Sequence, residues 1–151
     1  MPSRHGRAGL RPGRRQQELT DLDAFRRIGE GRLPGLIGIE VEAIEVGRVR
    51  MRLPLRDDLL APNGYLHAGT VVALADSSCG YGCIASLPDG ATGFTTIELK
   101  TNFLGTALEG RLSIESTLVH GGRTTQVWDA TVTNEAGTKL ALFRCTQLLL
   151  Y

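Results

Sequence analysis

The sequence predicts an α+β domain in which an antiparallel sheet of five to six strands wraps around one long central helix. Three observations support this prediction. Residues 68–86 are almost free of charge and are apolar or small on every side, as in a helix enclosed by a core. Segments that alternate apolar and polar residues stand before and after this helix. Short Gly- and Asn-containing turns join the later segments, which favours antiparallel neighbours.

Two strands and one short helix are predicted ahead of the central helix. Residues 20–30 predict a helix capped by Thr20. Residues 37–45 and 48–55 alternate as strands do, and residues 57–64 contain the Pro and Asn-Gly signals of a loop. In the first strand the inward residues are expected to be Ile39, Val41 and Ala43, and in the second Val49, Met51, Leu53 and Leu55, with Arg48, Arg50 and Arg52 exposed.

Four further strands are predicted after the central helix, over residues 94–104, 110–120, 124–133 and 139–150. The helix itself contains Gly80 and Gly82, each of which costs roughly 1 kcal/mol of helix stability relative to Ala. Such glycines let another backbone or a ligand approach closely, so we expect a close contact here.

Composition and charge indicate one globular domain. The chain has 151 residues, of which 42% are hydrophobic and 22% charged, and its formal net charge is +1. This balance gives no argument for nucleic acid or a membrane as partner. Residues 1–15 differ, with five Arg and no acid. We expect residues 1–18 to be a basic, disordered tail and residues 19–151 a single domain; a phosphate- or nucleic-acid-binding arm is the alternative for the tail.

Neither targeting nor metal binding is predicted. Arg14-Arg15 is followed by polar residues instead of the apolar core of an export signal, and no run approaches the ~18 apolar residues of a membrane span. We therefore expect a cytoplasmic protein. Cys79 and Cys83 share a helix face and Cys145 stands far away in the sequence, so we expect neither a disulfide framework nor a metal site.

Asp76 is the residue that most demands a function. It lies in the middle of the uncharged helix, where a carboxylate loses its water. No basic residue stands within one turn to pair with it. The loop that leads into the helix carries Asn63 and His67. A buried acid below a His- and Asn-bearing loop is a candidate active site, although His67 could instead cap the helix and Asn63 could be a turn residue.

Four motifs together resemble a known family. They are Asn63-Gly64-Tyr65-Leu66-His67-Ala68-Gly69, Leu74-Ala75-Asp76, Glu98-Leu99-Lys100-Thr101-Asn102-Phe103-Leu104 and Gly122-Arg123-Thr124. This combination resembles the hotdog-fold acyl-CoA thioesterases, in particular the phenylacetyl-CoA thioesterase-like branch, over about residues 33–150. The family usually shows His-Gly-Gly where this chain has His67-Ala68-Gly69; alanine keeps the backbone N–H.

The resemblance implies a thioester hydrolase that releases a free acid and coenzyme A from an aryl- or medium-chain acyl-CoA, without a cofactor. It assigns polarisation of the carbonyl to the Ala68 N–H, helped by Gly69, and the role of base or nucleophile to Asp76. Thr96 matches the position of a hydroxyl that orients the attacking water. The catalytic candidates are therefore Asp76, Asn63, His67, Ala68, Gly69 and Thr96.

The same resemblance places a basic residue that contacts coenzyme A near Gly122-Arg123, where a solvated turn arginine is the alternative. Aromatic residues are candidates for the acyl pocket, although most aromatic residues of a small domain belong to its core. The substrate-binding candidates are Arg123, Gly122, Tyr81 and Phe103.

Helix geometry predicts that the site is shared between subunits. Ala68 and Asp76 are eight residues apart, about 12 Å along a helix that rises ~1.5 Å per residue, so one chain cannot hold one carbonyl between them. Two antiparallel helices would bring Asp76 of one beside Ala68 of the other. One sheet also covers only part of the central helix. We expect a homo-oligomer, either a dimer or a dimer of dimers (a homotetramer).

Two other functions fit the same residues. The first is a hotdog-fold acyl dehydratase or hydratase, in which His67 would be the base. The second is a non-catalytic module that binds or senses acyl-CoA, with the basic tail as its contact arm. The sequence leaves the acyl group open, and also whether Asp76 is base or nucleophile.

Overall fold

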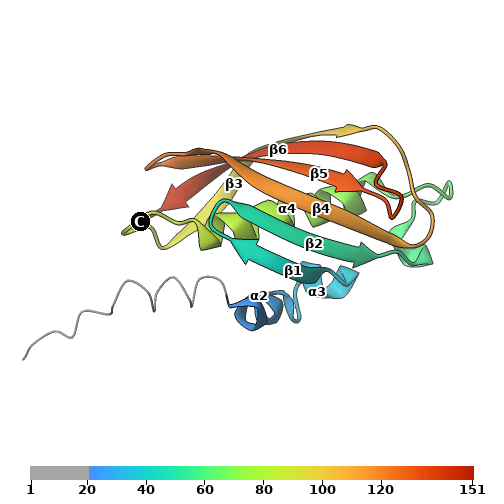
Figure 1. Ribbon diagram of the computed structural model, residues 1–151, viewed down its shortest axis with the longest axis horizontal. Coiled ribbons are helices and arrows are strands. Elements are labelled where there is room, and N and C mark those ends of the chain that lie inside the picture. Colours follow the sequence, from blue (N-terminus) through green and yellow to red (C-terminus); the bar gives the residue numbers. More distant parts are fainter. Residues whose placement is uncertain (1–20) are drawn as a thin grey trace, which may run out of the picture.

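One six-stranded antiparallel sheet curves around the long helix α4 (Ala68–Ala85). The computed structural model describes residues 21–151, so the predicted basic tail over residues 1–18 lies outside the described residues. The sheet order is β1-β2-β4-β5-β6-β3 (Figure 1). The strands are β1 (Glu40–Glu45), β2 (Arg48–Pro54), β3 (Gly93–Phe103), β4 (Arg111–Gly121), β5 (Thr125–Thr133) and β6 (Lys139–Leu150). The predicted sheet around a central helix is confirmed.

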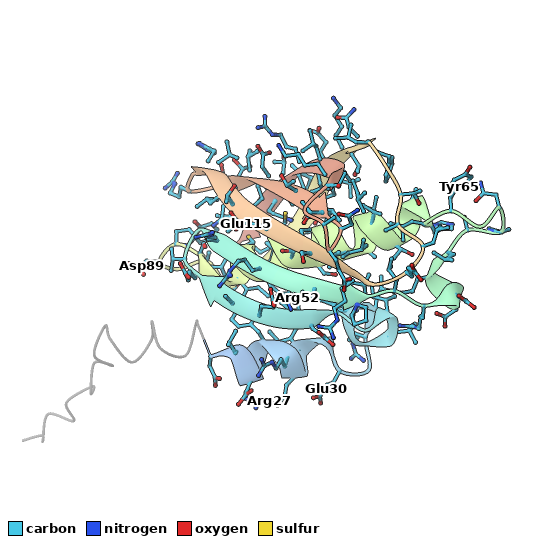
Figure 2. All side chains as sticks on the ribbon, turned by 45° about the vertical axis from the view of Figure 1, so that its right-hand side comes forward. Arg27, Glu30, Arg52, Tyr65, Asp89 and Glu115 are labelled. Carbon is cyan, nitrogen blue, oxygen red and sulfur yellow. The ribbon has the colours of Figure 1, made fainter. Side chains whose placement is uncertain are left out.

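The core lies between α4 and the inner face of the sheet. Eleven of the 18 helix residues are buried, which leaves no broad polar face and explains the uncharged sequence. On the sheet side, three of the four residues predicted to face inward are fully buried, Val49, Met51 and Leu53; the fourth, Leu55, lies just beyond β2 and is half-buried. The arginines that alternate with them lie on the outer face, where Figure 2 labels Arg52. Arg48 pairs with Glu115 at 2.8 Å, and Arg52 pairs with Glu42 at 2.6 Å.

The two glycines of α4 make room for aromatic rings. A Cβ on Gly82 would lie 2.6 Å from the Trp128 indole, and one on Gly80 would lie 3.0 Å from the tip of Phe94. The close approach that the sequence predicted is therefore present, but the approaching groups are side chains of β5 and β3, and neither is a backbone or a ligand.

Hydrogen bonds fix both ends of α4. At its end, the Ser86 carbonyl accepts from Gln126 Nε2 at 2.8 Å and the Ser86 hydroxyl from the Gly47 N–H at 2.9 Å. At its start, the Thr70 hydroxyl donates to the carbonyl of Leu59, in the 3-10 turn η1 (Asp57–Leu59), at 2.8 Å. These contacts set the position of the helix along its own axis, and hence the position of Asp76 over the sheet.

The start of the domain differs from the prediction in three ways. Asp21 is the cap of α2 (Leu22–Gly29), since its side chain accepts from the Asp23 N–H at 3.0 Å, whereas the predicted cap, Thr20, lies outside the described residues. Residues 33–37 form the short helix α3 (Leu33–Ile37), although the first strand was predicted to begin at Ile37. Pro34 favours that helix start and Gly38, with φ of +89°, ends it, so β1 begins only at Glu40.

A register shift also changes the inward residues of β1. The shift lies between Val41 and Ala43, where β1 bulges against β2. The bulge turns Ile44 into the core beside Val41, so Ala43 is only half-buried, contrary to the predicted alternation.

The two edges of the sheet are treated differently. At β1, helix α2 lies alongside the strand, and Arg26 Nη2 donates to the Val41 carbonyl at 3.3 Å (Figure 1). At the other edge, β3 pairs only with β6 among residues 21–151. Three apolar side chains of this strand are exposed, Ile97, Leu99 and Phe103, at 56%, 42% and 51%. A long, apolar, open edge is a surface for pairing with another strand.

No helix over residues 21–151 is long and apolar enough to span a membrane.

Replacing Gly82 by Ala is expected to destabilise the fold by about 1–3 kcal/mol, because the new methyl group meets the buried Trp128 ring, and this exceeds the gain in helix propensity. Gly80→Ala is the matched comparison, since Phe94 is only half-buried and can shift. Urea unfolding of both variants measures the difference; equal stability of Gly82→Ala and wild type would contradict this packing.

Candidate active site

Asp76 and Thr96 meet where α4 crosses β3. Asp76 is half-buried in the middle of the helix, and the Thr96 hydroxyl donates to its Oδ1 at 3.1 Å. Within the described part of the chain, Asp76 forms no ion pair with any Arg, Lys or His. The structure therefore brings together two of the six catalytic candidates and leaves the carboxylate without a cationic partner.

Gln147 completes this cluster and was missed by the sequence analysis. It lies on β6 opposite Thr96, and its Oε1 accepts from the Thr96 hydroxyl at 2.8 Å. Its Nε2 donates to Cys145 Sγ at 3.3 Å. A signal was present in the sequence: Gln147 is the one strongly polar residue among the inward positions of β6, which are otherwise Ala141, Phe143, Cys145 and Leu149.

The start of α4 presents a backbone N–H without a partner. His67 is the cap: its Nδ1 accepts from the Gly69 N–H at 2.8 Å, its carbonyl accepts from the Thr70 N–H at 3.0 Å, and its own N–H donates to the Leu59 carbonyl at 3.3 Å. These bonds use three of the four N–H groups that a helix start leaves unpaired. The fourth, on Ala68, has no acceptor in the described structure, and it points where the helix dipole favours negative charge.

Asn63 has a local role in the single chain. Its Oδ1 accepts from the Tyr65 N–H at 3.2 Å, which is the hydrogen bond of an Asx turn, and the residue is exposed. This turn carries Tyr65 outward at one end of the molecule (Figure 2). The adjacent Leu66 N–H donates to Thr106 Oγ1 at 3.0 Å, which ties the loop to the segment after β3.

The two halves of the predicted site stay apart in one chain. Ala68 is the first residue of α4, and Asp76 lies two turns further on, about 12 Å away along the helix axis. A single carbonyl group cannot contact both. The geometry therefore requires either a second copy of the chain or a different set of catalytic groups.

The four substrate-binding candidates lie in three places. Tyr81 is buried on another face of α4, where its ring lies 5.6 Å from that of Phe25 and lines a cleft of about 630 Å³ between α2 and β1. Burial raises the pKa of Tyr81. Phe103 is exposed at the end of β3. Gly122 and Arg123 form the turn between β4 and β5, and Tyr151 donates to the Arg123 carbonyl.

The three cysteines are buried thiols of the core. Burial, followed by a hydrogen bond with Cys145, raises the pKa of Cys79 well above its ordinary value. Burial likewise raises the pKa of Cys83 to about 12. Thiols in this state stay protonated at neutral pH, whereas metal ligands and nucleophiles are thiolates. Residues 21–151 contain no cluster of three or more His, Cys, Asp or Glu that could hold a metal ion.

A six-stranded antiparallel sheet that curves around one long helix is the architecture of a hotdog fold. The chain belongs to the thioesterase superfamily, whose family model matches residues 63–141. This match spans all six catalytic candidates, and it makes the protein a thioester hydrolase.

Two curated relatives extend over most of the chain. The 1,4-dihydroxy-2-naphthoyl-CoA hydrolase of Listeria monocytogenes is 32% identical over 110 residues, which are 73% of this chain and 89% of that protein. The Escherichia coli 1,4-dihydroxy-2-naphthoyl-CoA hydrolase is 30% identical over 132 residues, which are 85% of this chain and 94% of that protein.

Solved structures show the same fold. A mutant of the thioesterase PA1618 from Pseudomonas aeruginosa superposes with a TM-score of 0.81 at 26% identity, covering 86% of this chain and 94% of that one. The PaaI protein of Escherichia coli gives 0.77 at 20% identity, covering 85% and 91%, a likeness of fold.

Replacing His67 by Ala is expected to destabilise the domain by about 1 kcal/mol, because the Gly69 N–H loses its acceptor. His67→Asn keeps an acceptor at the cap and should retain most of the stability. Thermal and urea unfolding of both variants test the assignment. Equal loss in the two variants would show that the cap is not what His67 contributes.

Proposed function

We propose that the protein hydrolyses the thioester of an aryl- or medium-chain acyl-CoA, with Asp76 as general base or nucleophile and the Ala68 N–H as donor to the carbonyl oxygen. One observation carries the proposal: a carboxylate without a cationic partner lies in the middle of the core helix, held by Thr96, while the start of the same helix keeps a free N–H. The names of the two naphthoyl-CoA hydrolases support an aryl-acyl substrate.

The chemistry needs an attacking oxygen and a stabilised oxyanion. Asp76 either takes a proton from water as the water oxygen bonds to the carbonyl carbon, or attacks that carbon itself and is released by water. Negative charge then develops on the carbonyl oxygen, which the Ala68 N–H and the helix dipole stabilise. The carbon–sulfur bond then breaks. In the first route the sulfur of coenzyme A takes the proton held by Asp76; in the second it leaves as a thiolate and takes the proton that is released when water hydrolyses the acyl-Asp76 anhydride.

The open edge of β3 supports a two-fold dimer as the catalytic unit. Asp76 lies beside Thr96, near the beginning of β3, whereas the loop before Ala68 is tied to Thr106, just beyond the end of β3. Antiparallel pairing of two β3 strands would set the beginning of one against the end of the other. Asp76 of one protomer would then face Ala68 of its partner, as the proposed chemistry requires.

Arg123 is proposed to contact the phosphates of coenzyme A. Its turn lies at the end of the sheet where β3 begins, because Leu149, beside Thr124, belongs to the stretch of β6 that pairs with the start of β3. That is also the end nearer to Asp76. An exposed guanidinium there can form bidentate hydrogen bonds with a phosphate.

His67 is not well suited to the dehydratase chemistry in which it would be the base. Its Nδ1 already accepts from Gly69, so in the neutral ring the other nitrogen carries the proton. The ring can therefore donate a hydrogen bond but has no free lone pair with which to remove a proton.

Replacing Asp76 by Asn is expected to lower kcat for acyl-CoA hydrolysis by at least about a hundredfold, because the amide neither accepts a proton nor attacks the carbonyl. Free-thiol release from a panel of aryl- and aliphatic acyl-CoAs measures the loss. Asp129→Asn is the control, since Asp129 pairs with Arg144 on the outer face at 2.6 Å. Wild-type turnover by folded Asp76→Asn would refute the proposed role.

Replacing Leu99 by Glu is expected to give a monomer without activity. Leu99 lies on the inner face of the edge strand β3, so a glutamate at this position would place a charge in the proposed dimer interface. Leu142→Glu is the matched control: Leu142 is 41% exposed, against 42% for Leu99, but lies on the outer face of β6. Sedimentation velocity gives the mass of each variant. A Leu99→Glu protein that remains a dimer would contradict assembly through β3.

A further inference from the structure

Two fully buried glutamines lie opposite each other on neighbouring strands and have different partners. Gln126 on β5 is the register partner of Gln147 on β6. Gln126 donates to the Ser86 carbonyl and accepts from Trp128 Nε1, both at 2.8 Å, so its amide holds the end of α4 and the core indole. The hydrogen bonds of Gln147 lead elsewhere: its Oε1 accepts from Thr96 and its Nε2 donates to Cys145 Sγ.

The Thr96 hydroxyl has one proton and two acceptors. It lies 3.1 Å from Asp76 Oδ1 and 2.8 Å from Gln147 Oε1. A hydroxyl donates only one hydrogen bond at a time, so the amide oxygen competes with the carboxylate for this proton. Gln147 therefore determines how fully Thr96 can serve Asp76.

A half-turn of the Gln147 amide reverses this competition. It exchanges the amide oxygen and nitrogen with little change of shape. The N–H would then donate to Thr96 Oγ1, and the amide oxygen would accept from the Cys145 thiol. The Thr96 proton would be left to Asp76 alone, and the four side chains would form one directed chain of hydrogen bonds.

We propose that Gln147 is a positioning residue that acts through Thr96. By turning its amide, it lets Thr96 donate a hydrogen bond to Asp76 when Asp76 is ionised and accept one when Asp76 is protonated. While Asp76 is a carboxylate, the amide N–H faces Thr96 and the hydroxyl donates to Asp76. After Asp76 has taken a proton from water, Asp76 donates to Thr96, and Thr96 donates to the amide oxygen. The proton on Asp76 passes to the sulfur of coenzyme A as the carbon–sulfur bond breaks. This inference rests on the proposed function, since it assigns Gln147 a part in that reaction.

The test compares Gln147→Met with Gln126→Met in the full-length protein. Gln147→Met fills the same space without a hydrogen bond, and we expect kcat to fall about tenfold, the effect of one lost hydrogen bond, with KM changed less than about twofold. The melting temperature of Gln147→Met should stay near that of wild type. Gln126→Met should do the reverse. Its melting temperature should fall, but kcat of the folded protein should stay near that of wild type, because the Gly47 and Thr70 hydrogen bonds still hold the two ends of α4. Gln147→Leu serves in place of Gln147→Met if the latter does not fold.

A double-mutant cycle shows whether Gln147 acts through Thr96. Thr96→Val should lower kcat, and adding Gln147→Met to it should lower kcat no further. Multiplied losses in the double variant, or a wild-type kcat in Gln147→Met, would overturn the inference alone. If wild-type protein hydrolyses no acyl-CoA of the panel, the proposed function fails and the inference falls with it.

Discussion

The hydrogen bond from Thr96 to Asp76 joins the helix to the open edge of the sheet, and the functional account depends on it. Asp76 stands in the middle of a helix whose other surroundings are apolar, so its charge has few groups to stabilise it. Thr96, 20 residues later in the sequence, donates a hydrogen bond to this carboxylate. The fold must hold α4 and β3 in one fixed relation for the bond to form.

That fixed relation comes from contacts well away from the acid. Gln126 and the Gly47 N–H donate hydrogen bonds to Ser86, the residue directly after α4. At the start of α4, the Leu59 carbonyl accepts a hydrogen bond from the Thr70 hydroxyl. Gly82 lets the Trp128 ring pack directly against the helix backbone, which brings the sheet close. None of these contacts involves Asp76.

Much of this architecture could be predicted from the sequence because the strongest signals are local. The uncharged helix, the alternation of β2 and the isolated Asp76 are each visible within a window of 20 residues. The short helix over residues 33–37 was not, since five residues show no periodicity and only Pro34 and Gly38 mark its limits. Gln147 was missed because its role depends on the pairing of β3 with β6, and the sequence does not show which strands pair. The thioesterase family was found from four short motifs, and the match over residues 63–141 confirms it.

The central claim is that Ala68 of one protomer and Asp76 of its partner form one site, and subunit mixing tests it most directly. Ala68→Pro removes the N–H donor but suits the first helical position, because His67 already has the extended backbone, φ −68° and ψ 129°, that precedes proline. Each of Ala68→Pro and Asp76→Asn should be nearly inactive alone. After subunit exchange, an equal mixture should regain up to about a quarter of wild-type activity, since half of the dimers carry one intact site. Heterodimers that form but recover no activity would contradict the shared site.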